Sequence, residues 1–290
     1  DGTYTYNMYQ DGTRIADDLS STTYNATLND DAANQFYVKT KYYAGETEAS
    51  NKIGFAKGNS SLSSWEMGAN DKLTLLPNSD LTISGTLSNS TPANLILEDG
   101  AQLIHSSQGV KATVKKNIAA YTTEDYGWHF ITPPTTEGVT PTEENGFLNG
   151  TIGEGNNSYD LYYYDEPTHY WKNYESNTFT LANKQGYLYA NSNPTTLEFA
   201  GTLTKSDEDV TITGLSHSAT ELNGYNLVGN PFVCNAKVDK DFYVIDNVNN
   251  KVILAEEGRQ IAPCEGVFVQ ITADDATVTF SKATTAQSNN

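Results

Sequence analysis

Residues with catalytic side chains are numerous in this chain, but their spacing matches no catalytic motif. Thirty-six of the 290 residues are Asp or Glu, so neighbouring acids such as Asp165 and Glu166, or those at 207–209, follow from composition alone. A glycosidase needs only two carboxyl groups about 5 to 10 Å apart, yet these acids lie in predicted turns, where solvated charges are usual. Ser216 directly precedes His217, and neighbouring strand side chains point to opposite faces, so we interpret this pair as a turn. We expect no enzymatic activity.

Metal-binding patterns are equally sparse. None of the four histidines has a second histidine or a carboxylate at the spacing of a helical metal motif. Asp239, Asp241 and Asp246 are weak calcium candidates, because their spacing matches no known calcium loop. We therefore expect no metal and no other cofactor.

The chain has two cysteines, Cys234 and Cys264. Two cysteines are too few for a four-cysteine metal site. They form either one disulfide bridge or two buried thiols, and the sequence favours neither.

The strongest candidate for a binding site is an aromatic hairpin over residues 159–174, with its turn at 165–168. Alternation along the first strand sends Leu161 and Tyr163 to one face, and Tyr162 and Tyr164 to the other. Tyr and Trp surfaces suit sugar rings or protein partners, whereas cross-strand aromatic pairs that only stabilise the sheet are the competing interpretation. The candidate ligand-binding residues are Tyr162, Tyr164, Tyr170, Trp171 and Tyr174.

The charge of the chain excludes some partners. Only 17 Lys and Arg oppose the acids, and the formal net charge is −19. Such a charge repels phosphate backbones and anionic lipids, so nucleic acid is not an expected partner. The sequence also lacks the run of about 18 apolar residues that would predict a transmembrane helix.

Strand patterns dominate the elements that must position these residues. Apolar and polar residues alternate at 35–42, 210–213 and 267–271, and helical periodicity is nearly absent. Asp-Gly and Asn-Gly pairs, as at 11–12 and 223–224, supply tight hairpin turns. The sequence predicts an all-β protein of more than one module.

Residues 1–57 are predicted to form a meander, with strands ending at Tyr9 and spanning 14–16, 22–28, 35–43 and 52–56. Residues 4–15 and 37–45 resemble the later strands of fibronectin type III domains, most closely those of Bacteroides- or Porphyromonas-like surface adhesins and gingipain haemagglutinin regions. Two features depart from that family: the first two strands are missing, and Phe36 stands where a corner tyrosine is usual. Because residues 4–9 alternate as a strand with nothing ahead to pair with, we expect the chain to continue into further domains.

Residues 58–108 are predicted to be a linker with a few rungs of a β-solenoid. Short apolar units recur at 73–75, 81–87, 95–97 and 101–103, separated by small polar residues. Two or three rungs would need capping by neighbouring structure. An irregular β-linker is the alternative.

An internal duplication marks residues 109–285. The segments 127–133, 160–165 and 184–190 are echoed in the same order by 224–231, 241–246 and 264–270. Two such sets predict one jelly-roll-like antiparallel β-sandwich with pseudo-two-fold symmetry, followed by a disordered tail at 286–290. Residues 224–232 also resemble a segment common in secreted Bacteroidetes surface proteins.

These patterns together predict a non-enzymatic, adhesin-like protein at the outer-membrane surface or outside the cell, which binds host protein or glycan. Two alternatives stay open. One is an architectural spacer or stalk within a larger surface protein. The other is a carbohydrate-binding accessory module of a polysaccharide-degrading enzyme.

Overall fold

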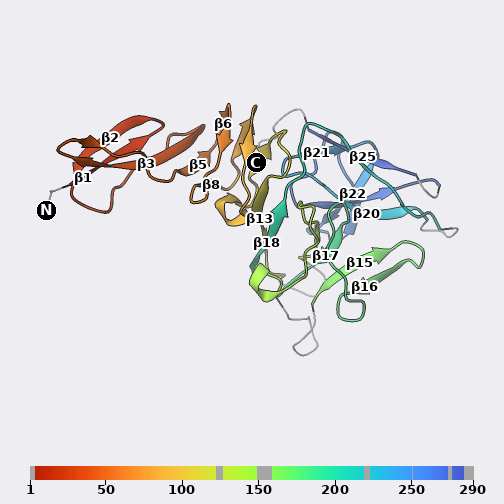
Figure 1. Cartoon of the computed structure of the whole chain (residues 1–290). Coiled ribbons are helices and arrows are strands. Elements are labelled where there is room, and N and C mark those ends of the chain that lie inside the picture. The colour runs from red at the N-terminus through yellow and green to blue at the C-terminus, as the bar shows by residue number, and fades with distance from the viewer. Residues whose placement is uncertain are drawn as a thin grey trace. The chain divides into compact units, whose positions relative to one another are not determined.

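The computed structural model describes residues 4–121, 127–148, 159–218, 223–249, 251–273 and 276–283 (Figure 1). Strands build almost all of the regular structure in these ranges, and the helices there are two single 3-10 turns, η1 (Pro92–Asn94) and η2 (Glu143–Asn145). The chain divides into two compact units, Asp1–Thr113 and Val114–Asn290. The predicted all-β class is confirmed.

The first unit begins with an antiparallel meander, drawn in red in Figure 1. β1 (Thr5–Gln10) lies between β2 (Thr13–Leu19) and β3 (Ala32–Tyr42), and the short β4 (Gly45–Glu46) pairs with the end of β3. The strand predicted at 22–28 is wrong, because this segment pairs with no strand and is mostly exposed. The buried amide of Asn34 instead ties down its end, through hydrogen bonds with the N–H and the carbonyl of Asn29 at 2.7 and 3.0 Å.

The predicted β-solenoid is present with three rungs, and its first strand, β5, is one that the sequence assigned to the meander. The first rung has β5 (Ile53–Lys57), β6 (Asn59–Leu62) and β7 (Trp65–Glu66). The second has β8 (Lys72–Leu75), β9 (Asp80–Ile83) and β10 (Leu87–Ser88), and the third has β11 (Leu95–Leu97) and β12 (Gln102–Ile104). Equivalent strands pair in parallel, with Leu95 beside Leu73 and Leu103 beside Leu81. β3 pairs with β5 and so covers the first rung.

Along these strands every second side chain points into the solenoid, and these inward side chains are apolar. The interior ladder is fully buried and consists of Leu73, Leu75, Leu81, Ile83, Leu87, Leu95, Leu97 and Leu103. Trp65 of the first rung is also buried, and its ring lies against Gly54 of β5. A Cβ atom on Gly54 would lie only 2.0 Å from the Trp65 ring, so the tryptophan fits only because residue 54 has no side chain.

This contact yields a stability prediction for the first unit. Gly54→Ala is expected to lower the free energy of unfolding by about 1–3 kcal/mol, because the new methyl group overpacks the first rung. A chain that already carries Trp65→Leu should tolerate Gly54→Ala at little further cost, since the clashing ring is gone. Equilibrium urea unfolding of the four chains gives both values, and equal penalties in the two backgrounds would show that the contact does not limit packing.

The second unit contains two four-stranded antiparallel sheets with the same strand order. One runs β14 (His129–Ile131), β17 (Tyr187–Tyr189), β15 (Leu161–Asp165), β16 (Tyr170–Asn173). The other runs β20 (Tyr225–Gly229), β24 (Gly266–Gln270), β22 (Phe242–Asp246), β23 (Lys251–Leu254). The registers also agree: Phe130 lies opposite Leu188, and Leu227 lies opposite Phe268. The duplicated segments of the sequence therefore form equivalent sheets.

The two copies are joined by reciprocal backbone hydrogen bonds. Thr132 donates to the carbonyl of Cys264 at 3.1 Å, and the equivalent Gly229 donates to the carbonyl of Lys184 at 2.8 Å. Lys184 and Cys264 both have left-handed backbone, with φ of 75° and 62°, in equivalent turns. The matching contacts give the second unit its internal pseudo-two-fold symmetry.

The remaining strands extend this sandwich. β19 (Val210–Ile212), β25 (Val278–Lys282) and β21 (Ala236–Val238) form a third sheet, and β13 (Lys111–Ile118) pairs with β18 (Thr195–Thr202). The boundary between the units falls inside β13, whereas the sequence placed it at 108/109. The boundary predicted at 57/58 falls inside the first solenoid rung, and the predicted tail at 286–290 lies outside the described residues.

Candidate functional site

The aromatic hairpin predicted from the sequence is formed by β15 and β16. Tyr164 lies opposite Trp171, and Tyr162 lies opposite Asn173, so these four side chains share one face. The rings of Tyr164 and Trp171 meet edge to face, with their centroids 5.3 Å apart. Trp171 remains 37% exposed, so this pair both packs and faces solvent.

The second copy of the duplication completes a groove around this pair. The aromatic groove, as we name it, has a volume of about 390 Å³ and is lined by Tyr164, Trp171, Tyr225, Tyr243, Val252 and Phe268. The ring of Phe268 lies 5.2 Å from that of Tyr164 and 5.9 Å from that of Trp171. Phe130, Leu227 and Phe268 form the buried core beneath the groove.

The groove is asymmetric although the two copies share one topology. Trp171 of β16 lies opposite Tyr164, and Val252 of β23 lies opposite Ile245 at the equivalent position. The large ring therefore stands on one side of the groove, and the half-exposed Val252 stands on the other. The two copies therefore differ at this position, where the first has a tryptophan and the second a valine.

The lining residues that the structure describes are all uncharged. Burial raises the pKa of the Tyr164 hydroxyl, and the nearby carboxylates of Glu166 and Asp165 raise it further. The hydrogen bond that the Tyr225 hydroxyl donates to Tyr243 raises the pKa of Tyr225, with burial as a smaller cause. Tyr164 and Tyr225 therefore stay protonated at neutral pH and present hydroxyl groups at an otherwise apolar surface.

The five candidate residues divide between the groove and other surroundings. Tyr164 and Trp171 line the groove, while Tyr162 packs against Trp128, with ring centroids 5.9 Å apart. Tyr170 is 69% exposed and lies on the opposite face of the hairpin. Tyr174 packs edge to face against Tyr159 and Phe179.

Sequence reasoning missed the groove residues Tyr225, Tyr243, Val252 and Phe268, which all come from the second copy. The internal duplication contained the signal. The hairpin at 160–174 has its equivalent at 241–254, so the duplication predicts a matching exposed face on the second hairpin.

Glu166, in the turn between β15 and β16, anchors this hairpin to the segment before β20. Its Oε1 accepts hydrogen bonds from the Ser218 N–H and the Gly224 N–H, both at 2.7 Å, and from the Ser218 hydroxyl at 2.8 Å. These bonds lower the pKa of Glu166 to about 2 and outweigh the opposing effect of burial. Glu166 is therefore ionised at neutral pH although only 3% of the residue is exposed.

His169 adds a third member to this cluster, because its Nε2 lies 2.5 Å from the Ser218 hydroxyl. The order of the groups differs from that of a hydrolytic triad, in which the imidazole lies between hydroxyl and carboxylate. Here the hydroxyl lies between the other two groups. Residues 213–218 form no strand, and the serine in contact with His169 is Ser218.

The other acidic candidates serve local structure. Asp165 accepts a hydrogen bond from the Thr168 hydroxyl at 2.6 Å and pairs with Lys172 at 3.6 Å. Glu208 pairs with Lys205 at the 207–209 cluster. These partners tie the carboxylates to their own turns.

The calcium candidates do not share a site. Asp239 accepts a hydrogen bond from the Thr279 N–H at 2.9 Å, whereas Asp246 caps the β22–β23 turn by accepting from Val248 and Asn249. Asp241 is exposed. Within the described ranges, no three His, Cys, Asp or Glu residues gather as metal ligands would. Cys234 and Cys264 are both buried, and no disulfide joins them.

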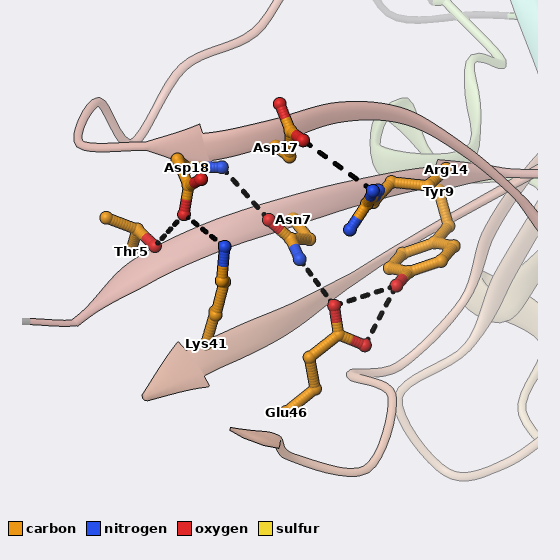
Figure 2. Close-up of polar contacts among 8 residues, drawn as sticks. All are labelled: Thr5, Asn7, Tyr9, Arg14, Asp17, Asp18, Lys41 and Glu46. Carbon is orange, nitrogen blue, oxygen red and sulfur yellow. Dashed lines mark hydrogen bonds and ion pairs between the residues drawn. The ribbon is translucent and has the colours of Figure 1, made fainter. Parts of the chain in front are cut away.

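A second polar cluster lies in the meander of the first unit, and Figure 2 shows its members. Asn7, fully buried, donates to the Glu46 carboxylate and accepts a hydrogen bond from the Asp18 N–H at 3.0 Å. Tyr9 donates to the same carboxylate, and Asp18 pairs with Lys41 at 2.7 Å. These partners lower the pKa of Asp18 and of Glu46. The cluster ties β2, β1, β3 and β4 together, so we interpret it as structural.

Comparisons with protein-family models, with curated proteins and with solved structures find no match to this chain. None of the helices in the described part of the chain has the length and hydropathy that crossing a bilayer requires. The aromatic groove and the pseudo-two-fold symmetry that forms it are therefore the features that indicate a function.

Proposed function

We propose that this chain is a non-enzymatic binding module of an adhesin-like protein at the cell surface or outside the cell, and that it holds host protein or glycan in the aromatic groove. The observation that supports this proposal most is the groove itself. One concave surface is formed by five aromatic residues and one valine, and its tryptophan is 37% exposed; they are Tyr164, Trp171, Tyr225, Tyr243, Phe268 and Val252. Rigid aromatic rings provide large contact areas at a small cost in conformational entropy.

Packing of the core alone does not account for the exposed rings of the groove. Phe130, Leu227 and Phe268 form the buried core beneath it, and Trp171 packs on Phe130 while 37% of the tryptophan stays exposed. Exposed apolar surface of this kind commonly marks interaction sites. Tyrosine hydroxyl groups at the rim supply the polar contacts that orient a ligand.

Binding screens on glycan arrays and immobilised extracellular-matrix proteins test this proposal. We expect the intact chain to bind at least one of them, and Trp171→Ala to weaken that binding by about 2 kcal/mol, or roughly thirtyfold, as expected for a central aromatic contact. Tyr170→Ala is the matched control, because it removes an exposed ring from the opposite face of the same hairpin. Absence of binding by the intact chain, or equal losses in both variants, would contradict the proposal.

An architectural spacer is the second candidate, and the solenoid favours it. Three stacked rungs with a buried apolar interior extend the first unit along one direction, as a rigid connector requires. This candidate predicts that Trp171→Ala changes neither binding nor adhesion. The same screen therefore distinguishes the two candidates, and a bound polysaccharide would indicate the carbohydrate-binding accessory module.

A further inference from the structure

The aromatic groove has the composition of a site for a positively charged group. Tyr164, Trp171, Tyr225 and Tyr243 line it together with Phe268, and each ring carries negative potential on its face. A Lys, Arg or methylated ammonium group held against such faces is attracted by about 0.5–2 kcal/mol per contact, with Trp the strongest partner. A sugar ring or an apolar side chain would use the same rings without this electrostatic gain.

The charges around the groove favour the same kind of ligand. Glu166 does not line the groove, but its ionised carboxylate lies close enough to Tyr164 to raise the pKa of the Tyr164 hydroxyl. Its hydrogen bonds come from the uncharged donors of Ser218 and Gly224. Asp165 lies opposite Tyr170, on the face of the hairpin away from Trp171, where it pairs with Lys172 at 3.6 Å. The ammonium group of Lys172 lies over the Tyr170 ring, on the face of the hairpin opposite to Trp171. The side chains that line the groove thus place no cation in it.

The net charge of the whole chain also favours a positively charged ligand. With 36 acidic residues against 17 basic ones, the surface attracts cationic partners and repels acidic ones. Anionic glycans such as uronate or sulfate polymers would approach against this field. A neutral glycan would gain nothing from it.

From this charge complementarity we propose that the partner of the aromatic groove is a basic polypeptide segment, which inserts a Lys or Arg side chain between Trp171 and the rings of Tyr225 and Tyr243. This inference rests on the proposed binding function and names the ligand class of that site. It commits to a protein partner. Neutral glycans and uncharged peptides are therefore the competing ligands that a test must include.

The test uses the full chain and three probes: a lysine-containing peptide, the same peptide with each Lys replaced by Gln, and a mixture of neutral oligosaccharides. The readout is the indole N–H resonance of Trp171, assigned by its loss in Trp171→Phe. We expect the lysine peptide to shift this resonance, with an affinity at least tenfold higher than that of the glutamine peptide. Raising the salt from about 50 to 500 mM should weaken the lysine complex, because both partners are charged.

Two variants locate the charge effect. Glu166→Gln keeps an acceptor oxygen for the Ser218 and Gly224 N–H groups but removes the charge. We expect it to weaken lysine-peptide binding severalfold more than it weakens glutamine-peptide binding. Tyr170→Ala should leave both unchanged. Equal binding of the two peptides, or a Trp171 shift with oligosaccharide alone, would overturn the basic-ligand inference while supporting the groove as a binding site. No shift with any probe would count against the inference and the proposed function together.

Discussion

The Tyr187→Ala variant is expected to lose about 3–5 kcal/mol of the free energy of unfolding of the second unit. Tyr187 is among the largest fully buried side chains and stacks on Phe179, with ring centroids 5.6 Å apart. Its hydroxyl accepts a hydrogen bond from the Ala182 N–H at 2.7 Å, in the turn that leads into β17. Removing the side chain thus creates a cavity and leaves a backbone donor without its partner.

Tyr187→Phe separates these two contributions. It keeps the ring and removes only the hydroxyl, so we expect a smaller loss of about 1–3 kcal/mol, which is the cost of leaving the Ala182 N–H unpaired. Equilibrium urea unfolding measures both values, with Tyr43→Ala as the control because Tyr43 is fully exposed. A midpoint for Tyr187→Ala equal to that of Tyr43→Ala would mean that this core does not hold the second unit together.

Acid is expected to destabilise the second unit through Glu166. The folded pKa of about 2 lies below the ordinary value of 4.5, so the native state binds this proton more weakly than the unfolded chain does. The resulting stabilisation, about 3 kcal/mol, is complete above pH 4.5 and is lost as the pH falls toward 2. Glu166→Gln should lower the stability at pH 6 and approach the parent chain near pH 2.

Unfolding curves for the parent and Glu166→Gln between pH 2 and 6 check this expectation. Glu257→Gln controls for the change in net charge, because it removes a carboxylate from an exposed position. A constant difference between the parent and Glu166→Gln across this range would show that the Glu166 carboxylate gains nothing from its ionisation in the folded state.

The sequence predicted those parts of the fold that repeat. Leucines at 73, 75, 95 and 97 alternate within short strands, and the duplicated segments keep their order, so the solenoid and the paired sheets could both be inferred. The strand at 52–56 was assigned to the meander instead of the solenoid, because Gly54 and Trp65 of the first rung do not repeat the leucine pattern of the later rungs. The strand predicted at 22–28 is absent, because an alternating segment forms a strand only where another strand pairs with it, and none does so there.

The sequence predicted only the part of the aromatic groove that lies on the hairpin β15–β16. Tyr164 and Trp171 are adjacent across one hairpin, so local alternation suffices to bring them together. Tyr225, Tyr243 and Phe268 reach the groove only through the pseudo-two-fold packing of the two sheets, which is a long-range arrangement that spacing along the chain does not encode. The Glu166 anchor is similar, because it joins residues 52 and 58 positions apart.

Hydroxyl-radical footprinting of the full chain, with and without a partner found in the binding screens, tests the central claim that ligand contacts the aromatic groove. The account predicts that the partner protects Trp171, Tyr225 and Tyr243 from oxidation, while Tyr170 and Tyr43 react as before. A bound partner that leaves the oxidation of Trp171 and Tyr243 unchanged would contradict the claim and place the binding surface elsewhere on the chain.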